Sequence, residues 1–260
     1  MLFKSITSNG ISSNSRNKLR LKPWQKQEWC IPKIDAEYVW RMEDVLELYG
    51  DPFDESQPVI CFDETPYQLI GETRPSIPMK LGQPLRQDYE YERHETTNIF
   101  LFVQPLVGWR HAKVTTQRTR SDFACCMLDL ATVHFPNAAK IHVVLDNLNT
   151  HSPSTLYEIL SPREAREIVR RLEFHYTPKH ASWLNIAEIE FSVLHKQCLD
   201  RYISSIGMLE KEVMAWESRR NDQKAKVEWM FAVEDARNKM GHLYPKLLKT
   251  VANHLEQKAQ

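Results

Sequence analysis

Two apolar segments of the chain each run directly into an acidic residue, and this repeated pattern constrains the fold more than any other feature. Val59–Phe62 leads into Asp63, where we expect the first strand to stop, and Val143–Leu145 leads into Asp146. Short apolar runs of this kind are typical of buried strands. Open α/β sheets place their sites at the carboxyl ends of the strands. If the two strands are parallel neighbours, Asp63 and Asp146 therefore face one cavity.

The order of the remaining segments predicts a mixed α/β sheet covered by helices. Some segments carry apolar residues at helical spacing, whereas others alternate or are continuously apolar, as strands are. We expect helices at 35–49, 121–134, 154–172 and 182–202, strands at 59–62, 140–147 and 174–178, a hairpin at 97–117, a long loop at 75–95 and helical structure after about 205. Asp35 is the expected N-cap of the first helix.

Charge and composition divide the chain into four parts. Residues 1–34 form a basic arm, 35–57 a helix and connector, 58–203 the main α/β domain and 204–260 a C-terminal helical extension. The whole chain has 34 basic and 34 acidic residues, so its net charge indicates no particular partner. The first 28 residues differ, because they hold six basic residues and one acidic one.

Two groups of basic residues are candidate contacts to DNA phosphates. A solvated surface is the alternative for both groups. The first group lies in the arm and consists of Arg16, Lys18, Arg20, Lys22 and Lys26. The second lies in the C-terminal part and consists of Arg219, Arg220, Lys224 and Lys226.

The segment 182–202 supplies a third carboxylate. Its apolar residues recur at spacings of three and four, which places them on one helical stripe: Leu184, Ala187, Phe191, Leu194 and Cys198. Glu188 lies at the edge of that stripe, whereas Glu190 is expected to face solvent. A carboxylate beside a buried face is costly unless it is paired or binds a metal ion. Glu188 is therefore the candidate ligand, with a salt bridge at the helix edge as the alternative.

Three carboxylates gathered in one cavity predict a divalent cation, because like charges repel and a bound cation relieves the repulsion. Oxygen ligands without cysteine or clustered histidine favour Mg²⁺ or Mn²⁺ over Zn²⁺. Such a site can hold two ions that serve an in-line phosphoryl displacement. The alternative is that Asp63 and Asp146 each begin a turn, which is a common role of Asp after a strand.

Other classes of function are disfavoured by what the sequence lacks. Seven glycines without a GxGxxG or GxxxxGK[ST] motif argue against a nucleotide cradle. No apolar run approaches the roughly 20 residues of a membrane span, and we expect neither membrane insertion nor secretion. Five cysteines without a CxxC pair indicate reduced thiols. The ten histidines form no HExxH motif, and His134, His142 and His254 are interpreted as core or surface residues.

Three blocks of the sequence resemble a known family. They read FDET at 62–65, LDNLNTH at 145–151 and YTPKHASWLNIAE at 176–188. In this order they are similar to the signature blocks of DDE transposases of the mariner-like superfamily, in its bacterial insertion-sequence branch. The resemblance implies an RNase H-like catalytic fold that moves an insertion sequence by cutting and joining DNA strands.

The resemblance also assigns roles to residues. It implies that Asp63, Asp146 and Glu188 are the catalytic acids and hold Mg²⁺, for which Mn²⁺ substitutes, as two ions. It places four further residues around them: Glu64, Asn147, His151 and Asn185. The partners it implies are the ends of the element, target DNA, and a second copy of this chain or a full-length transposase. We expect the protein in the bacterial cytoplasm, associated with DNA.

Two departures from the family pattern bear on these expectations. Between Asp146 and Glu188 lie 41 residues, more than is usual, and we expect the extra ones within 152–172. Helix-turn-helix domains usually precede the catalytic part, whereas here only the basic segment 16–29 does. The sequence is therefore interpreted as a truncated copy, one frame of a split gene, or a protein that relies on a second polypeptide.

The sequence predicts the catalytic domain of a transposase that cleaves DNA and transfers strands with bound metal. One alternative is an RNase H-like nuclease without strand transfer. Another is an inactive truncated transposase that acts as an interaction or inhibitor protein.

Overall fold

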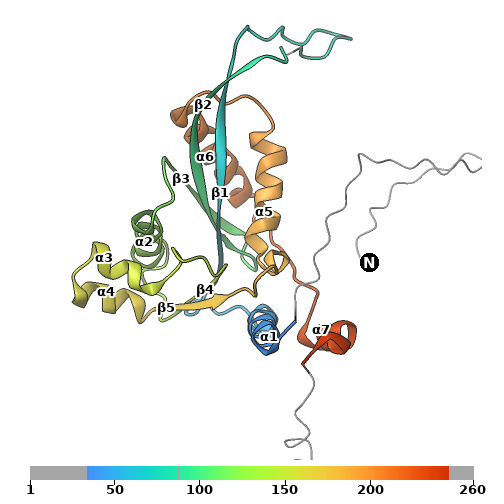
Figure 1. Cartoon of the computed structure of the whole chain (residues 1–260). Helices are drawn as coiled ribbons and strands as arrows, with labels where there is room; N and C mark the ends of the chain where they lie inside the picture. The colour runs from blue at the N-terminus through green and yellow to red at the C-terminus, as the bar shows by residue number, and fades with distance from the viewer. Residues whose placement is uncertain (1–33, 87, 246–260) are drawn as a thin grey trace, which may run out of the picture. The chain divides into compact units, whose positions relative to one another are not determined.

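The computed structural model describes residues 34–86 and 88–245 and contains a five-stranded mixed sheet in the order β3-β2-β1-β4-β5 (Figure 1). The strands are β1 (Val59–Glu72), β2 (Tyr91–Gln104), β3 (Trp109–Thr115), β4 (Ile141–Leu145) and β5 (Leu172–Tyr176). β2 pairs antiparallel with both β1 and β3, whereas β1–β4 and β4–β5 are parallel pairs. The predicted mixed α/β architecture is confirmed.

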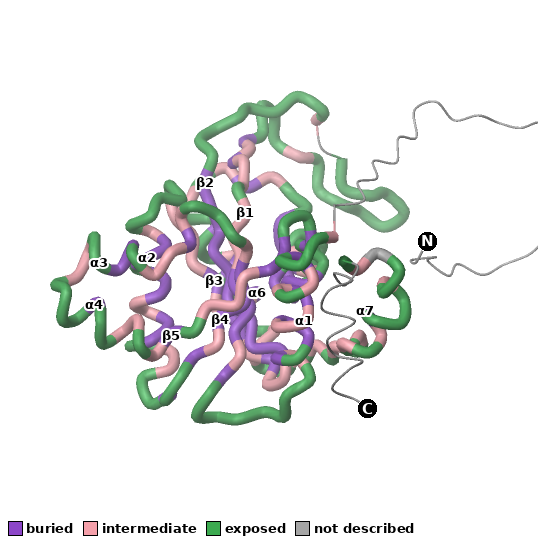
Figure 2. The backbone as a smooth tube through the Cα atoms, turned by 60° about the horizontal axis from the view of Figure 1, so that its bottom comes forward, coloured by how far each residue is buried: buried purple, intermediate pink, exposed green. Residues whose placement is uncertain are grey.

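Helices cover both faces of this sheet. They are α1 (Ala36–Gly50), α2 (Arg120–Asp129), α3 (Leu156–Ile159), α4 (Pro162–Val169), α5 (Ile186–Leu194), α6 (Ile206–Asp222) and α7 (Val233–Met240), with short 3₁₀ or π segments at 130–134, 153–155, 182–184, 195–199 and 241–243. One hydrophobic core joins the sheet to α1, α5 and α6, and the other joins it to α2, α3 and α4. Figure 2 shows the buried strands between these layers. None of the described helices combines the length and apolar character needed to span a bilayer.

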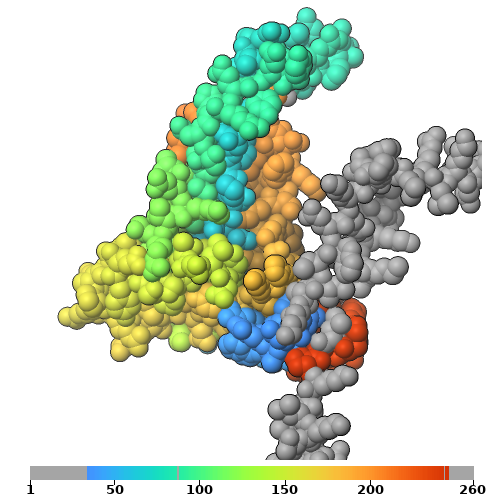
Figure 3. All heavy atoms as spheres, in the orientation of Figure 1, coloured from blue at the N-terminus to red at the C-terminus, as the bar shows by residue number. Residues whose placement is uncertain are grey.

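The sheet confirms the predicted hairpin but corrects the first strand. β1 does not stop at Asp63, because its antiparallel pairing with β2 continues from Asp63↔Leu101 to Glu72↔Tyr91. Only the parallel pairing with β4 ends nearby, at Cys61↔Val144. The predicted loop is shorter for the same reason, since β2 already begins at Tyr91. Figures 1 and 3 show this β1–β2 hairpin extending past the rest of the sheet.

Three predicted helices differ in their bounds. The helix expected at 154–172 is interrupted, because Ser161 caps a new helix in which Pro162 is the first residue. The helix expected at 182–202 begins only at Ile186, after its N-cap Asn185. After 205 the structure is not continuously helical, since residues 224–232 between α6 and α7 lie outside any helix. The first helix and its Asp35 cap agree with the prediction.

Glu190 was expected to face solvent, but its side chain is buried on α5. Two arginines explain this position. Arg220 of α6 donates from Nε to Glu190 Oε1 at 2.8 Å and from Nη2 to Oε2 at 3.0 Å. Arg110 of β3, itself fully buried, places Nε 2.9 Å from Glu190 Oε1. Because these charges neutralise the carboxylate, Glu190 joins α5, α6 and β3 inside the core.

Glycine is required at the turn before β3. Gly108 has a φ of +76°, and a Cβ there would lie 2.5 Å from the backbone carbon of Lys224. The close approach brings the segment after α6 against the β2–β3 turn, where Arg110 Nη2 donates to Ala225 O at 2.5 Å. The arginine thus binds both Glu190 and the neighbouring backbone.

We expect Glu190→Gln to lower the free energy of unfolding by about 3–5 kcal/mol, because it leaves two arginines without their counter-charge in the core. Chemical denaturation followed by circular dichroism measures this loss. Glu188→Gln is the matched control on the exposed side of the same helix, and it should change stability by no more than about 0.5 kcal/mol toward destabilisation. Similar losses in both variants would contradict the burial of Glu190.

Candidate active site

The parallel register of β1 and β4 places Asp63 and Asp146 at the same level of the sheet. Cys61 and Val144 are paired, and both point into the core formed with α1, α5 and α6. Asp63 and Asp146 each follow two residues later. Asp63 points to the side that α5 covers, because side chains two residues apart on a strand share a face. Asp146 lies past the end of β4, and its carboxylate contacts His151, which stacks on Phe123 of α2. The register therefore brings the two predicted acids to one level of the sheet, although β1 itself continues.

Asn185 positions the start of α5 against β1. Its Oδ1 accepts from Ala187 N at 3.1 Å as the helix N-cap, and its Nδ2 donates to Phe62 O at 2.9 Å. The same Nδ2 lies 3.4 Å from Asp63 Oδ2. Glu188 stands in the first turn of this helix and is exposed. The cap thus fixes the end of α5 that carries Glu188 against β1.

The neighbouring carboxylates help to shift the pKa of Asp63. Burial, together with the charges of Glu188, Asp146 and Glu64, raises the pKa of Asp63 from its ordinary 3.8 to about 7. Burial and the charge of Asp146 likewise raise the pKa of Glu188. Asp63 accepts one backbone hydrogen bond, from Glu64 N at 2.9 Å, but no arginine or lysine of the described residues pairs with it.

This donor set fits a divalent cation of the Mg²⁺ or Mn²⁺ kind. Such hard ions take carboxylate oxygens, and the three acids repel one another in the absence of a cation. Within the part of the chain that the structure describes, the oxygens of Asp63, Asp146 and Glu188 are not all within 4.8 Å of one another. Asp63, Asp146 and Glu188 remain the predicted ligands of such an ion.

His151 lies between two carboxylates beside this cluster. Its Nδ1 is 2.6 Å from Asp146 Oδ1 and its Nε2 is 3.0 Å from Glu64 Oε2. Both contacts are close ion pairs when the ring is protonated, and Nδ1 also lies 3.3 Å from Asp146 O. The imidazole is buried and stacks on Phe123, with ring centroids 4.8 Å apart. His151 therefore links Asp146 to Glu64, which points to the opposite face from Asp63.

The two carboxylates keep His151 protonated. Burial lowers its pKa, but the contacts and charges of Asp146 and Glu64 outweigh this and raise the pKa from 6.5 to about 9. At neutral pH the imidazolium balances part of the negative charge of the site. Asp63 and Glu188 lie outside these ion pairs.

The other predicted residues are distributed as follows. Asn147 is exposed directly after β4. Arg219, Lys224 and Lys226 are exposed as well. The predicted DNA contact of Arg220 is corrected, because its guanidinium is bound to Glu190. The basic residues of the arm, from Arg16 to Lys26, lie outside the described residues.

Sequence reasoning missed three residues around His151. Phe123 of α2 stacks on the ring, Tyr176 Oη donates to His151 O at 2.8 Å, and Arg118 Nη1 lies 3.8 Å from Glu64 Oε1. These contacts join elements that are far apart in the sequence, so no local sequence pattern predicts them. The N-cap role of Asn185 had a local signal, since Asn directly precedes the apolar helix.

Comparison with known proteins identifies the fold class first. The sheet order and its helical layers are RNase H-like, as in solved structures of Mos1 transposase. A pre-cleavage Mos1 transpososome has a TM-score of 0.54 at 12% identity over 86% of this chain and 68% of that chain. The Mos1 paired-end complex with the left transposon end has a TM-score of 0.51 at 14% identity over 77% and 61%. The match thus spans about three-fifths of the length of that Mos1 chain.

The family follows from the sequence match. Residues 58–210 match the family described as DDE superfamily endonuclease, and they make up more than half of the chain. The chain therefore belongs to the DDE superfamily endonucleases. The search of curated proteins finds no match.

We expect Asp63→Asn to stabilise the metal-free protein at pH 8 by about 1–4 kcal/mol, because it removes a carboxylate whose pKa is raised to about 7. The folded state binds this proton more tightly than the unfolded state, so the native carboxyl costs stability as the pH rises from about 4 to 7. Unfolding in the presence of a chelator, at pH 4 and pH 8, measures the effect. A gain of equal size at both pH values would contradict the assignment.

We expect His151→Gln to lower the free energy of unfolding by about 1–3 kcal/mol at pH 6.5, because it leaves Glu64 buried without its main counter-charge. The loss should shrink as the pH rises through about 9, where the native imidazolium loses its proton.

A double-variant cycle with Glu64→Gln separates the ion pair from simple packing. Adding Glu64→Gln to His151→Gln should restore most of the lost stability, since the unpaired charge is then gone. If the double variant is no more stable than His151→Gln alone, the ion pair does not account for the loss.

Proposed function

We propose that this chain is the catalytic part of a transposase that cleaves DNA strands and joins 3′ ends to target DNA. The observation that carries the proposal is the common level of Asp63 and Asp146 at two adjacent strands. The start of α5, whose first turn holds Glu188, is bound to β1 through Asn185. Membership in the DDE superfamily endonucleases supports the reaction class. Under this proposal the three acids are catalytic and hold the metal.

Each residue of the site has a distinct task in this proposal. A pair of bound divalent ions supplies the positive charge that stabilises the attacking and leaving oxygens of an in-line phosphoryl displacement. Asp63 and Asp146 present carboxylates from adjacent strands, and Asn185 holds Asp63 and the helix start in place. His151 keeps Asp146 oriented through its ion pair.

Solved structures of Mos1 support the choice of metal and partner. They include a Mos1 mariner paired-end complex with Mn, one with Mg, and a Mos1 strand transfer complex. We propose Mg²⁺ as the natural ion, with Mn²⁺ as a substitute and two ions in the site. The proposed DNA partners are the ends of an element and a target.

Finer parts of the proposal rest on the signature blocks. They support an element of the bacterial insertion-sequence kind and a place on DNA in the bacterial cytoplasm. Of the basic residues that the structure describes, Arg219, Lys224 and Lys226 are the proposed phosphate contacts, because their side chains are exposed. A second copy of the chain or a full-length transposase is the proposed protein partner.

Nicking of supercoiled plasmid in the presence of Mn²⁺ tests the catalytic assignment. We expect Asp146→Asn to lower the nicking rate about a hundredfold or more, because the site loses a charged metal ligand. Asp200→Asn is the matched control, since Asp200 is an exposed acid on a different segment, and it should nick as the native chain does. Nicking that survives Asp146→Asn would contradict the assignment.

A second assay separates transposase from nuclease. A labelled duplex with a free 3′-hydroxyl is incubated with plasmid, the metal and the protein. Joining of the label to the plasmid supports strand transfer, whereas nicking without joining supports an RNase H-like nuclease. Loss of activity when this chain is mixed with an active full-length relative, together with no activity of its own, would support an inhibitor.

A further inference from the structure

A second group of ligating side chains lies at the opposite end of β4 from Asp146. His142 on β4 is paired in register with Glu173 on β5, and His175 follows two residues later on the same face. One ligand atom from each of the three lies within 4.8 Å of the other two. His142 precedes Asp146 by four residues, which is about 13 Å along a strand. This group is therefore separate from the carboxylates of the candidate active site.

The two imidazoles already face each other with their ring nitrogens. His142 Nδ1 lies 3.0 Å from His175 Nε2. On its other side, His175 Nδ1 lies 2.8 Å from Asp44 Oδ2 of α1. A carboxylate at that distance accepts the Nδ1 proton, so the Nε2 lone pair of His175 accepts a hydrogen bond from His142 Nδ1–H. A metal ion between the two nitrogens would take the place of that proton, and His142 would carry its proton on Nε2. A carboxylate behind a histidine in this way is the usual outer partner of a metal-ligating imidazole.

We propose that His142 Nδ1, His175 Nε2 and a carboxylate oxygen of Glu173 bind one transition-metal ion of the Zn²⁺ or Co²⁺ kind. Two imidazoles with one carboxylate favour such ions over Mg²⁺. Ligand bonds of about 2.0–2.1 Å in a tetrahedral site separate two nitrogens by about 3.3 Å. The present separation of 3.0 Å must therefore widen slightly, and the rings must rotate so that both lone pairs converge on the ion.

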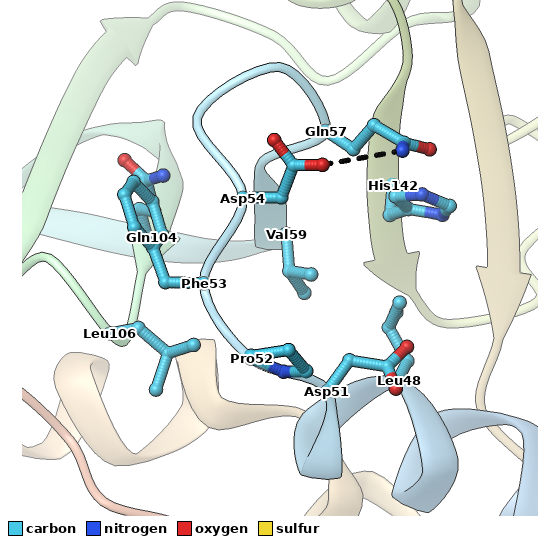
Figure 4. A pocket seen from close by; sticks show the side chains of 10 residues that line it. All are labelled: Leu48, Asp51, Pro52, Phe53, Asp54, Gln57, Val59, Gln104, Leu106 and His142. Atoms are coloured by element: carbon cyan, nitrogen blue, oxygen red, sulfur yellow. Dashed lines mark hydrogen bonds between the residues drawn. The ribbon is translucent and has the colours of Figure 1, made fainter.

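The site is open to solvent on two sides. The Glu173 side chain is 46% exposed, and its carboxylate is paired with the similarly exposed Lys140 at 3.0 Å. Lys140 can move into solvent when a metal takes its place. His142 also lines a pocket of about 230 Å³ beside Asp51 and Asp54 (Figure 4). An ion can therefore enter, and water can complete its coordination.

Another histidine pair serves for comparison. His111 and His134 lie with ring centroids 4.3 Å apart, and His111 Nδ1 lies 3.2 Å from Glu217 Oε1. Within the described part of the chain, however, this pair belongs to no group of three ligand atoms of the kind that surrounds His142. His134 is, like His142, a partly buried histidine whose pKa burial lowers. His134→Gln is therefore the matched control for His142→Gln.

Titration of the untagged, metal-free chain with Co²⁺ tests the proposal by visible absorption. We expect one equivalent to bind with the intense band of low-coordinate Co²⁺, and Zn²⁺ to displace it while excess Mg²⁺ does not. His142→Gln and His175→Gln should abolish the band. Asp44→Asn should weaken binding about 10–100-fold through the lost outer partner. Glu173→Gln should weaken it at least as much, because it removes a charged ligand.

The controls decide where the ion binds. His134→Gln and Asp146→Asn should bind Co²⁺ as the native chain does, and a loss of the band in either would overturn the proposal. Absence of the band in the native chain would overturn it as well. Circular dichroism checks folding of each variant. If His142→Gln does not fold, Glu173→Gln decides, because this exposed side chain can be changed without loss of the fold; unchanged affinity then overturns the proposal.

Discussion

The short parallel pairing of β1 with β4 is the constraint on which the rest of the structure depends. It extends only over Val59–Cys61 and His142–Val144, yet it joins the antiparallel strands β1–β3 to the parallel pair β4–β5. Its register brings Asp63 level with Asp146. A shift by one residue would remove this common level and would turn the side chains of one strand to the opposite face, because side chains alternate along a strand.

Two groups of buried charge in this molecule are balanced in different ways. Glu190 is enclosed by two arginines, so its charge is compensated by the protein itself. Asp63 sits among other carboxylates without such a partner in the described residues, and its pKa is raised to about 7. The charge of Glu190 is thus compensated, whereas the charge of Asp63 is unfavourable in the absence of a cation. A cation is therefore expected to bind beside Asp63.

The fold was predictable to the extent that its elements carry local patterns. The hairpin, β4, β5 and the first helix follow from alternation, apolar runs and caps. The continuation of β1 past Asp63 had no local signal, because it depends on pairing with β2 from a distant part of the chain. The prediction that Glu190 faces solvent was wrong for the same reason. The spacing of apolar residues on α5 carries no information about the arginines on β3 and α6.

The sequence by itself determined which segments become strands and helices, and it identified Asp63, Asp146 and Glu188 as candidate acids. Backbone preference and hydrophobic periodicity act over a few residues, and these features can be read in that range. Only the tertiary structure decided that Asp63 and Asp146 lie at one level of the sheet, that His151 is held between Glu64 and Asp146, and that His142 meets His175. Such contacts arise from strand register and helix docking, which bring together residues that no local pattern connects.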